Sequence, residues 1–248
     1  MQILTRTNAS KLKMLLVNGF EYRKILGFMD IEGWLARDEA VALYDVAKSL
    51  RAEQPVVVEI GSWLGKSSMV LAKALLAKKS PRLYCIDPFN GDGDAPSKTL
   101  FYRQADARVS LKQKFLANMR KYNVEHLIQV LPGYSYDLVN TFAEPIDFLF
   151  LDGNHEYAAT LRDFEEWSPL LRPGGSIALH DVCATGPFLG PWQVVEQYIF
   201  DSADWTEIRL VDKLLVARKN PRSQSVRLHE FAEVTEMAPA RDARGSRR

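Results

Sequence analysis

Short apolar runs that alternate with segments of helical character are the strongest constraint on the fold. The runs cover residues 55–60, 83–86, 127–131, 146–151 and 176–179. All but the third are followed directly by a glycine or an acidic or histidine residue, namely Gly61, Asp87, Asp152 and His180-Asp181. Strands of this length without an alternating polar face are buried on both sides, and strands separated by helices pair in parallel. We therefore predict an α/β fold with a doubly wound, mostly parallel seven-stranded sheet.

Two further runs at the C-terminal end complete the predicted sheet. Residues 206–211 and 214–218 are separated only by Asp212-Lys213, which is typical of an antiparallel hairpin. We also expect a helix over residues 67–79, and we expect Pro173-Gly174-Gly175 to end a later helix before the fifth run.

Chain length and polarity predict one large domain with terminal additions. A chain of 248 residues with 47% hydrophobic residues can bury one full-sized core. Residues 1–50 are expected to form a helical cap, residues 51–219 the catalytic domain, and residues 220–248, which are polar and Arg-rich, a loosely ordered tail.

Charge and cysteine content exclude several classes of protein. A net charge of +1 argues against a broad nucleic-acid surface, which needs many cations to neutralise phosphates. Every apolar stretch ends well before the roughly 18 residues of a membrane span, and Cys85 and Cys183 form no zinc spacing or disulfide framework. We expect a cytoplasmic protein with a small-molecule substrate, no nucleic acid or membrane partner, and a homo-oligomer as one option for its assembly.

The segment Glu59-Ile60-Gly61-Ser62-Trp63-Leu64-Gly65-Lys66-Ser67 follows the first run, at the edge where open α/β sheets bind ligands. Only three residues separate Gly61 from Gly65-Lys66-Ser67, one fewer than a phosphate-binding P-loop needs. The Gly-x-Gly-x-x-Gly pattern of dinucleotide sites is absent.

The pattern Glu-Ile-Gly-x-x-x-Gly-x-Ser resembles the first motif of class I S-adenosylmethionine-dependent methyltransferases, particularly the metal-dependent O-methyltransferases. Asp87, at the end of the second run, is placed to accept hydrogen bonds from the ribose hydroxyls. Gly133-Tyr134-Ser135 resembles the segment beside the adenine. The resemblance implies S-adenosylmethionine as cofactor, contacted by Glu59, Gly61, Ser62, Gly65, Ser67, Asp87, Gly133, Tyr134, Ser135 and Asp152.

Acidic and histidine residues follow the fourth and fifth runs, so their side chains should meet at one edge of the sheet. Asp152 and Asp181 could give Mg²⁺ its preferred oxygen ligands, and His180 could add a nitrogen ligand or orient a neighbour. His155 could reach the hydroxyl that receives the methyl group.

These residues resemble the metal-dependent methyltransferases of macrolide sugars and bacterial polysaccharides, and more distantly the catechol and caffeoyl-CoA enzymes. The resemblance implies Asp152 and Asp181 as metal ligands and His155 as the base. His180 departs from the pattern, since the sugar enzymes carry an acid there. The departure favours either a softer transition metal or catalysis by the histidines without a metal.

Three acids near this region are expected to lie outside the site. Asp92 and Asp94 lie in a turn-rich loop without the continuation of an EF-hand, so we expect a solvated turn. Asp163 is expected only to complement a helix dipole.

Three functions are consistent with the sequence. The first is a metal-assisted O-methyltransferase acting on a sugar, glycan or other small molecule. The second is a metal-dependent hydrolase that uses Asp152, His155, His180 and Asp181 around an activated water. The third is a non-catalytic scaffold with the same fold.

Overall fold

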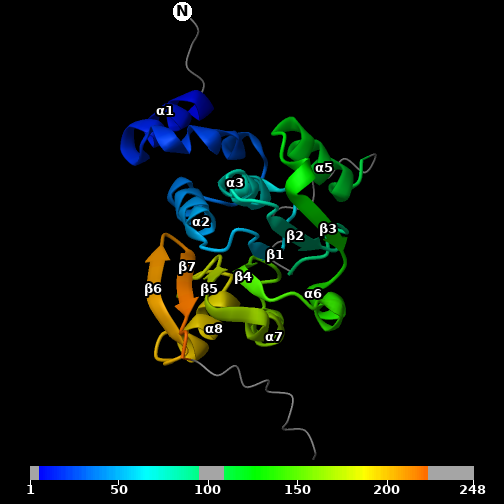
Figure 1. The fold of residues 1–248 in the computed structure, drawn as a ribbon, viewed down its shortest axis with the longest axis vertical. Coiled ribbons are helices and arrows are strands. Elements are labelled where there is room, and N and C mark those ends of the chain that lie inside the picture. Colours follow the sequence, from blue (N-terminus) through cyan, green and yellow to red (C-terminus); the bar gives the residue numbers. More distant parts are fainter. Residues whose placement is uncertain (1–5, 95–108, 223–248) are drawn as a thin grey trace, which may run out of the picture.

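The computed structural model describes residues 6–94 and 109–222, which form one seven-stranded sheet (Figure 1). The strand order is β3-β2-β1-β4-β5-β7-β6. The first five strands of this order are parallel, and β7 runs antiparallel between β5 and β6. The strands are Val56–Ile60 (β1), Arg82–Asp87 (β2), Ile128–Pro132 (β3), Ile146–Leu151 (β4), Leu171–Leu179 (β5), Trp205–Val211 (β6) and Leu214–Lys219 (β7). The predicted fold class and its C-terminal hairpin are confirmed.

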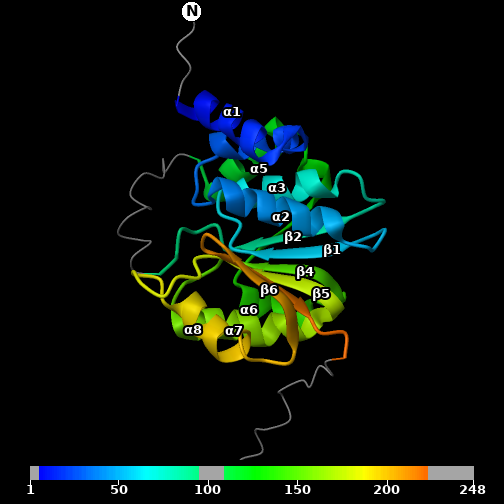
Figure 2. The same ribbon diagram turned by 90° about the vertical axis from the view of Figure 1, so that its left-hand side faces the viewer.

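Helices cover both faces of the sheet (Figure 2). α2, α3 and α5 lie over one face with α1 beyond them, and α6, α7 and α8 lie over the other. The helices are Arg6–Asn18 (α1), Arg37–Ser49 (α2), Lys66–Leu75 (α3), Leu111–Lys121 (α5), Ser135–Leu138 (α6), Tyr157–Trp167 (α7) and Gly190–Tyr198 (α8). Short 3₁₀ helices cover Phe20–Lys24 (η1), Leu26–Asp30 (η2), Glu125–Leu127 (η4), Val139–Thr141 (η5) and Ser168–Leu170 (η6).

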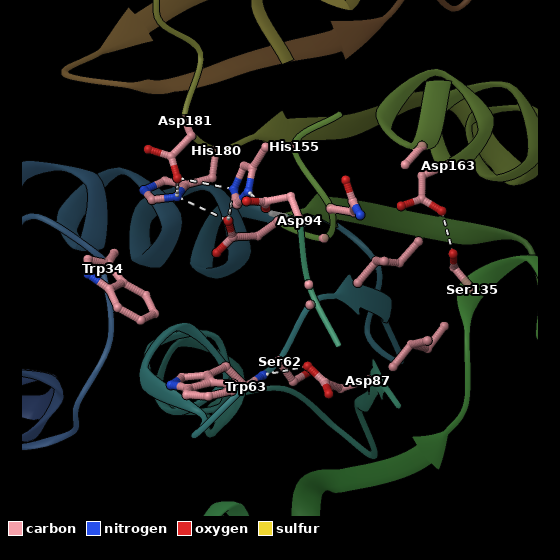
Figure 3. A pocket seen from close by; sticks show the side chains of 18 of the residues that line it. Trp34, Ser62, Trp63, Asp87, Asp94, Ser135, His155, Asp163, His180 and Asp181 are labelled. Atoms are coloured by element: carbon pink, nitrogen blue, oxygen red, sulfur yellow. Dashed lines mark hydrogen bonds and ion pairs between the residues drawn. The ribbon is translucent and has the colours of Figure 1, made fainter. Parts of the chain in front are cut away.

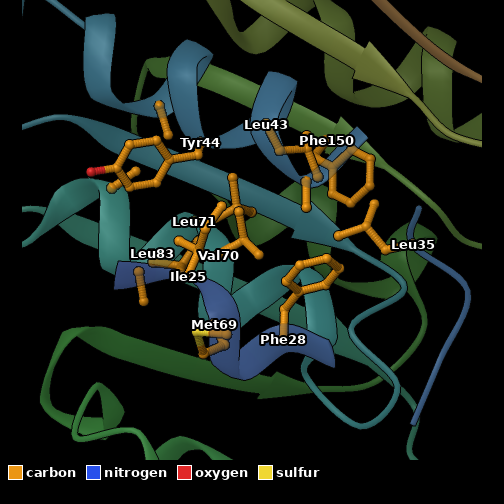
Figure 4. Packing of buried hydrophobic residues seen from close by; sticks show 14 of the residues in the cluster. Ile25, Phe28, Leu35, Leu43, Tyr44, Met69, Val70, Leu71, Leu83 and Phe150 are labelled. Atoms are coloured by element: carbon orange, nitrogen blue, oxygen red, sulfur yellow. The ribbon is translucent and has the colours of Figure 1, made fainter. Parts of the chain in front are cut away.

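Each face of the sheet has its own hydrophobic core. Every residue of β1 is buried, and Val57 packs into the cluster beneath α2 and α3, whereas Val58 and Ile60 pack into the cluster beneath α7 and α8. The first cluster also includes Ile25 and Phe28 from the N-terminal segment (Figure 4). The segment before α2 is therefore held by the same core as the sheet, and this places the residues that follow it at the sheet edge.

Two boundaries differ from the expectation. α3 ends at Leu75 rather than Lys79, because the Lys78 N–H turns back to the Leu75 carbonyl. Pro173-Gly174-Gly175 does not separate a helix from a strand but lies inside β5, beside an irregularity in its pairing with β4. A bulge of this kind tolerates proline and glycine within a strand.

The predicted C-terminal tail lies largely outside the described residues, whereas α1, η1, η2 and α2 all fall within the predicted N-terminal cap. The structure describes residues 220–222 of the expected tail and nothing after them. Within residues 6–94 and 109–222, no helix combines the length and apolarity that a membrane crossing requires.

Candidate active site

One large cavity opens at the carboxyl ends of β1, β2, β4 and β5 (Figure 3). The backbone pairing continues past the strands, since Asp152 N–H donates to the Ile60 carbonyl and His180 N–H donates to the Leu151 carbonyl. This continuation brings the ends of β1, β4 and β5 to one edge. The cavity volume is about 1090 Å³, above the roughly 300–1,000 Å³ of a typical site for one small molecule.

The glycine loop after β1 forms one wall of the cavity. Gly61 has φ +91°, and a Cβ atom on it would lie 1.9 Å from the Asp152 carbonyl oxygen, so only glycine lets the loop approach β4 this closely. Gly61, Ser62 and Ser67 line the cavity, as the sequence predicts.

Glu59 and Gly65, by contrast, do not line the cavity. Glu59 is fully buried and accepts hydrogen bonds from the hydroxyls of Ser62, Ser67 and Ser68. Burial raises the pKa of Glu59, against the effect of these hydroxyls. The expected contact of Glu59 with the cofactor is thus replaced by an indirect one, in which its carboxyl group fixes the loop from behind.

Asp87 lies at the end of β2 and faces the cavity beside the loop. Its Oδ2 accepts the Trp63 N–H at 2.8 Å and its Oδ1 accepts the Phe89 N–H at 2.6 Å. Burial raises the pKa of Asp87, and the two N–H donors oppose this. Because a carboxylate oxygen has more than one acceptor direction, both oxygens can still receive a ligand hydroxyl.

Ser135 and Asp163 form a third part of the wall, next to Gly133 and Tyr134. The Ser135 hydroxyl donates to Asp163 Oδ1. Burial raises the pKa of Asp163 to about 6, although the Ser135 hydroxyl acts in the opposite direction. The expectation that Asp163 only complements a helix dipole is therefore wrong, because α7 directs this side chain inward to the cavity.

Asp152, His155 and Asp181 converge at the ends of β4 and β5, and Figure 3 shows His155 and Asp181 across the cavity from Asp87. His155 Nε2 lies 3.2 Å from Asp181 Oδ2 and 3.9 Å from Asp152 Oδ1. One ligand atom of each residue lies within 4.8 Å of the other two, close enough for the three to share a metal ion. Burial would raise the pKa of Asp181, but the imidazoles of His155 and His180 outweigh it and hold that pKa well below its usual range.

His180 is 3% exposed and lies behind this cluster. Its Nδ1 lies 3.1 Å from Asp152 Oδ1 and its Nε2 lies 3.0 Å from Glu39 Oε2. Burial lowers the pKa of His180, but the surrounding carboxylates outweigh it and the pKa is raised well above its usual value. Both nitrogens face carboxylates, so of the two expectations for His180 this geometry favours the one in which it orients a neighbour, here Asp152, over that of a metal ligand.

His155 is held by two loops. Its Nδ1 lies 2.8 Å from Asp94 Oδ2, and its ring packs against Phe188 with 4.5 Å between ring centroids. Burial lowers the pKa of His155, but the carboxylates of Asp181, Asp94 and Asp152 outweigh it and raise the pKa to about 9. Asp94 is 3% exposed, so the expected solvated turn is wrong at this position.

Glu39 and Asp94 were not expected from the sequence as parts of the site. Glu39 gives a weak signal, since it stands among apolar residues on the buried face of α2, where an unpaired acid would be unfavourable. The sequence gives no signal for the contact between Asp94 and His155, because only the tertiary structure brings the loop after β2 to His155.

Comparisons with known proteins agree with this geometry. Residues 58–182, about half of the chain, match the family model described as a methyltransferase domain. The uncharacterized protein R132 of Acanthamoeba polyphaga mimivirus is 29% identical over 144 residues, which are 56% of this chain and 57% of that protein. The uncharacterized protein y4gI of Sinorhizobium fredii is 25% identical over 138 residues, which are 55% of this chain and 14% of that protein. The chain thus spans only part of these curated relatives.

Several solved structures share the fold. The O-methyltransferase TomG of Streptomyces achromogenes, in complex with S-adenosylmethionine, has a TM-score of 0.59 at 18% identity, covering 89% of this chain and 100% of that one. The O-methyltransferase of Bacillus cereus, in complex with S-adenosylhomocysteine, has a TM-score of 0.60 at 15% identity, covering 86% and 97%. The O-methyltransferase NovP has a TM-score of 0.60 at 20% identity, covering 75% and 81%.

The segment that matches the family model runs from β1 to the end of β5. It contains the glycine loop, Asp87 and the cluster of Asp152, His155 and Asp181, so every site residue predicted from the sequence falls within it. The chain belongs to the methyltransferase domain family.

Proposed function

We propose that this protein transfers the methyl group of S-adenosylmethionine to a hydroxyl oxygen of a sugar, glycan or other small molecule, with the assistance of a divalent cation. One observation carries the proposal. A single cavity has Ser62, Trp63 and Asp87 on one wall and His155 and Asp181 on the other (Figure 3), and Asp152 also lines it. Cofactor and acceptor can therefore meet between the two walls, as group transfer requires.

The cofactor half of the cavity has groups that suit S-adenosylmethionine. The free acceptor directions of Asp87 suit two ribose hydroxyls, and the loop at Gly61 and Ser62 presents backbone next to the same space. Ser135 and Asp163 line the same cavity next to Gly133 and Tyr134, the segment expected beside the adenine. TomG and the Bacillus cereus enzyme, which have this fold, bind S-adenosylmethionine and S-adenosylhomocysteine, and this supports the assignment.

The acceptor half fits a divalent cation. Asp152 and Asp181 offer carboxylate oxygens, and the buried His155 Nε2 lies 3.2 Å from Asp181 Oδ2. A divalent cation on the two carboxylates would polarise the acceptor oxygen and reduce the attraction that keeps the His155 pKa high. His180, itself held by Glu39, keeps Asp152 in place.

His155 has the position of a general base. A neutral Nε2 at this point can take the proton of the acceptor hydroxyl, a contribution of roughly 10²- to 10⁴-fold in rate. The acceptor oxygen then forms a bond to the methyl carbon as the bond between that carbon and the sulfonium sulfur breaks, leaving S-adenosylhomocysteine. The imidazolium so formed is stabilised by Asp94 and Asp181.

Calorimetric titration with S-adenosylmethionine, with and without Mg²⁺, tests the cofactor part. We expect the wild type to bind S-adenosylmethionine. Asp87→Asn should lower the affinity on the order of 100-fold, because a hydrogen bond to a charged group contributes about 1.5–3 kcal/mol. Asp201→Asn, which removes an exposed carboxylate from the turn after α8, should bind like the wild type. No binding by the folded wild type, with or without Mg²⁺, would refute the proposed function.

The reaction itself is tested with S-adenosylmethionine labelled in its methyl group and a panel of sugars, nucleotide sugars and catechols. We expect transfer of the label to at least one hydroxyl compound. EDTA should abolish this transfer, and added Mg²⁺ or Mn²⁺ should restore it. Transfer that is insensitive to EDTA and to Asp181→Asn would refute the metal-assisted mechanism while leaving the methyltransferase activity in place.

A further inference from the structure

We propose that Asp94 is a positioning residue, whose carboxylate holds His155 Nδ1 so that Nε2 faces Asp152 and Asp181. This proposal extends the proposed function, because the base role of His155 belongs to that function. The contact between Asp94 and His155 can nevertheless be tested without any methyl transfer.

The first support is the burial of Asp94. This side chain is 3% exposed, whereas Asp92, two residues earlier in the same loop, is exposed. A carboxylate withdrawn from water is costly unless it is paired, and the distance of 2.8 Å from Asp94 Oδ2 to His155 Nδ1 is that of a charge-assisted hydrogen bond. Asp94 is therefore placed for a partner rather than for solvent.

The second support is the anchoring of the loop that carries Asp94. At its start, the Phe89 N–H donates to Asp87, and the Phe89 ring packs on Phe115. In its middle, the Asn90 amide donates to the Tyr134 hydroxyl, which donates to Asp92. The residues that precede Asp94 are thus tied to both cofactor-side segments, and this fixes where Asp94 enters the cavity.

The third support is the arrangement around the His155 ring. Phe188 packs against the ring while Asp94 holds Nδ1, so both the tilt and the rotation of the ring are restrained. When Nδ1 carries its proton toward a carboxylate, the lone pair of a neutral imidazole is on Nε2. Nε2 is the atom that faces Asp152 and Asp181. Asp94 thus selects the nitrogen that acts.

Proton NMR of protein labelled with ¹⁵N-histidine tests the contact directly. The chain has four histidines, so His155→Gln identifies the His155 signals. In the wild type we expect a downfield, slowly exchanging Nδ1 proton on His155. Asp94→Asn should remove the charge-assisted hydrogen bond of the Nδ1 proton. The proton should then shift upfield and exchange faster with water. The matched control Asp201→Asn removes the same charge from an exposed position and should leave the signal unchanged.

Kinetics then separate positioning from a merely structural role. With an acceptor from the panel described above, Asp94→Asn should lower kcat on the order of 10- to 100-fold, the usual effect of losing such a supporting group. Its affinity for S-adenosylmethionine should stay that of the wild type. Asp94→Glu, which retains the carboxylate, should recover part of kcat.

The possible outcomes are distinct. A His155 Nδ1 proton unchanged in Asp94→Asn would overturn the proposal, as would an unchanged kcat. If Asp94→Asn fails to fold by circular dichroism, Asp94→Ser removes the same carboxylate and provides the NMR comparison. If the Nδ1 proton shifts in Asp94→Asn as expected but the wild type binds no S-adenosylmethionine, the contact between Asp94 and His155 is supported and the proposed function is refuted.

Discussion

Substitution of Asp163 by asparagine should stabilise the protein at neutral pH, although it removes a charge from a hydrogen-bonded site. Burial raises the pKa of Asp163 from its ordinary 3.8 to about 6 in the folded protein. The difference corresponds to about 3 kcal/mol as an upper value. An acid whose pKa is raised by folding stabilises the fold fully below pH 3.8, and this contribution is lost as the pH rises through about 6. At pH 7.5 the ionised Asp163 therefore costs stability.

Asparagine avoids this cost and retains an oxygen that can accept the Ser135 hydroxyl. We expect Asp163→Asn to increase the free energy of unfolding at pH 7.5 by about 1–3 kcal/mol, and the gain to shrink toward zero near pH 4. Urea unfolding at both pH values, compared with Asp201→Asn, measures the effect. A gain equal at both pH values, or a loss at pH 7.5, would refute the reasoning that burial sets this pKa.

Two further substitutions test the structural parts of the site. Gly61→Ala should destabilise the protein by more than about 2 kcal/mol and abolish cofactor binding, because its Cβ would meet the Asp152 carbonyl oxygen at 1.9 Å. Gly186→Ala, which has φ +108° but nothing within 4 Å of its Cβ, should cost only about 1 kcal/mol, and equal effects in thermal melts would contradict the close-approach argument. Glu39→Ala should cost about 3–5 kcal/mol in urea unfolding, because it leaves Nε2 of the buried His180 without its carboxylate partner. A cost below about 1 kcal/mol would show that His180 is neutral in the folded protein.

The doubly wound sheet could be predicted because its signals are local in the sequence. Each buried strand is a short apolar run, and β1, with every residue buried, is the clearest example. The glycine loop could also be predicted, because Gly61 comes directly after a strand and Gly65 comes directly before a helix. The convergence of Asp152 with Asp181 followed from topology, because parallel strand ends share one edge.

The roles of individual side chains within that edge were less predictable. Glu59 stands in the motif, yet its carboxyl group faces three serine hydroxyls rather than the cavity. Alternation along a strand determines which face a side chain takes, but not whether that face has space for a ligand. His180 shows the same limit, because only the packing of α2 brings Glu39 to its Nε2.

The sequence by itself determined the order of strands and helices, the position of the glycine loop and the edge where acids and histidines gather. These features depend on periodicity, glycine placement and strand ends, which are properties of neighbouring residues. Tertiary structure alone decided that Asp94 binds His155, that Asp163 faces the cavity, and that His180 lies between Asp152 and Glu39. These pairings join residues 28 to 141 positions apart in the chain. Contacts at such separations depend on how helices and loops pack over the sheet, and local pattern does not specify that packing.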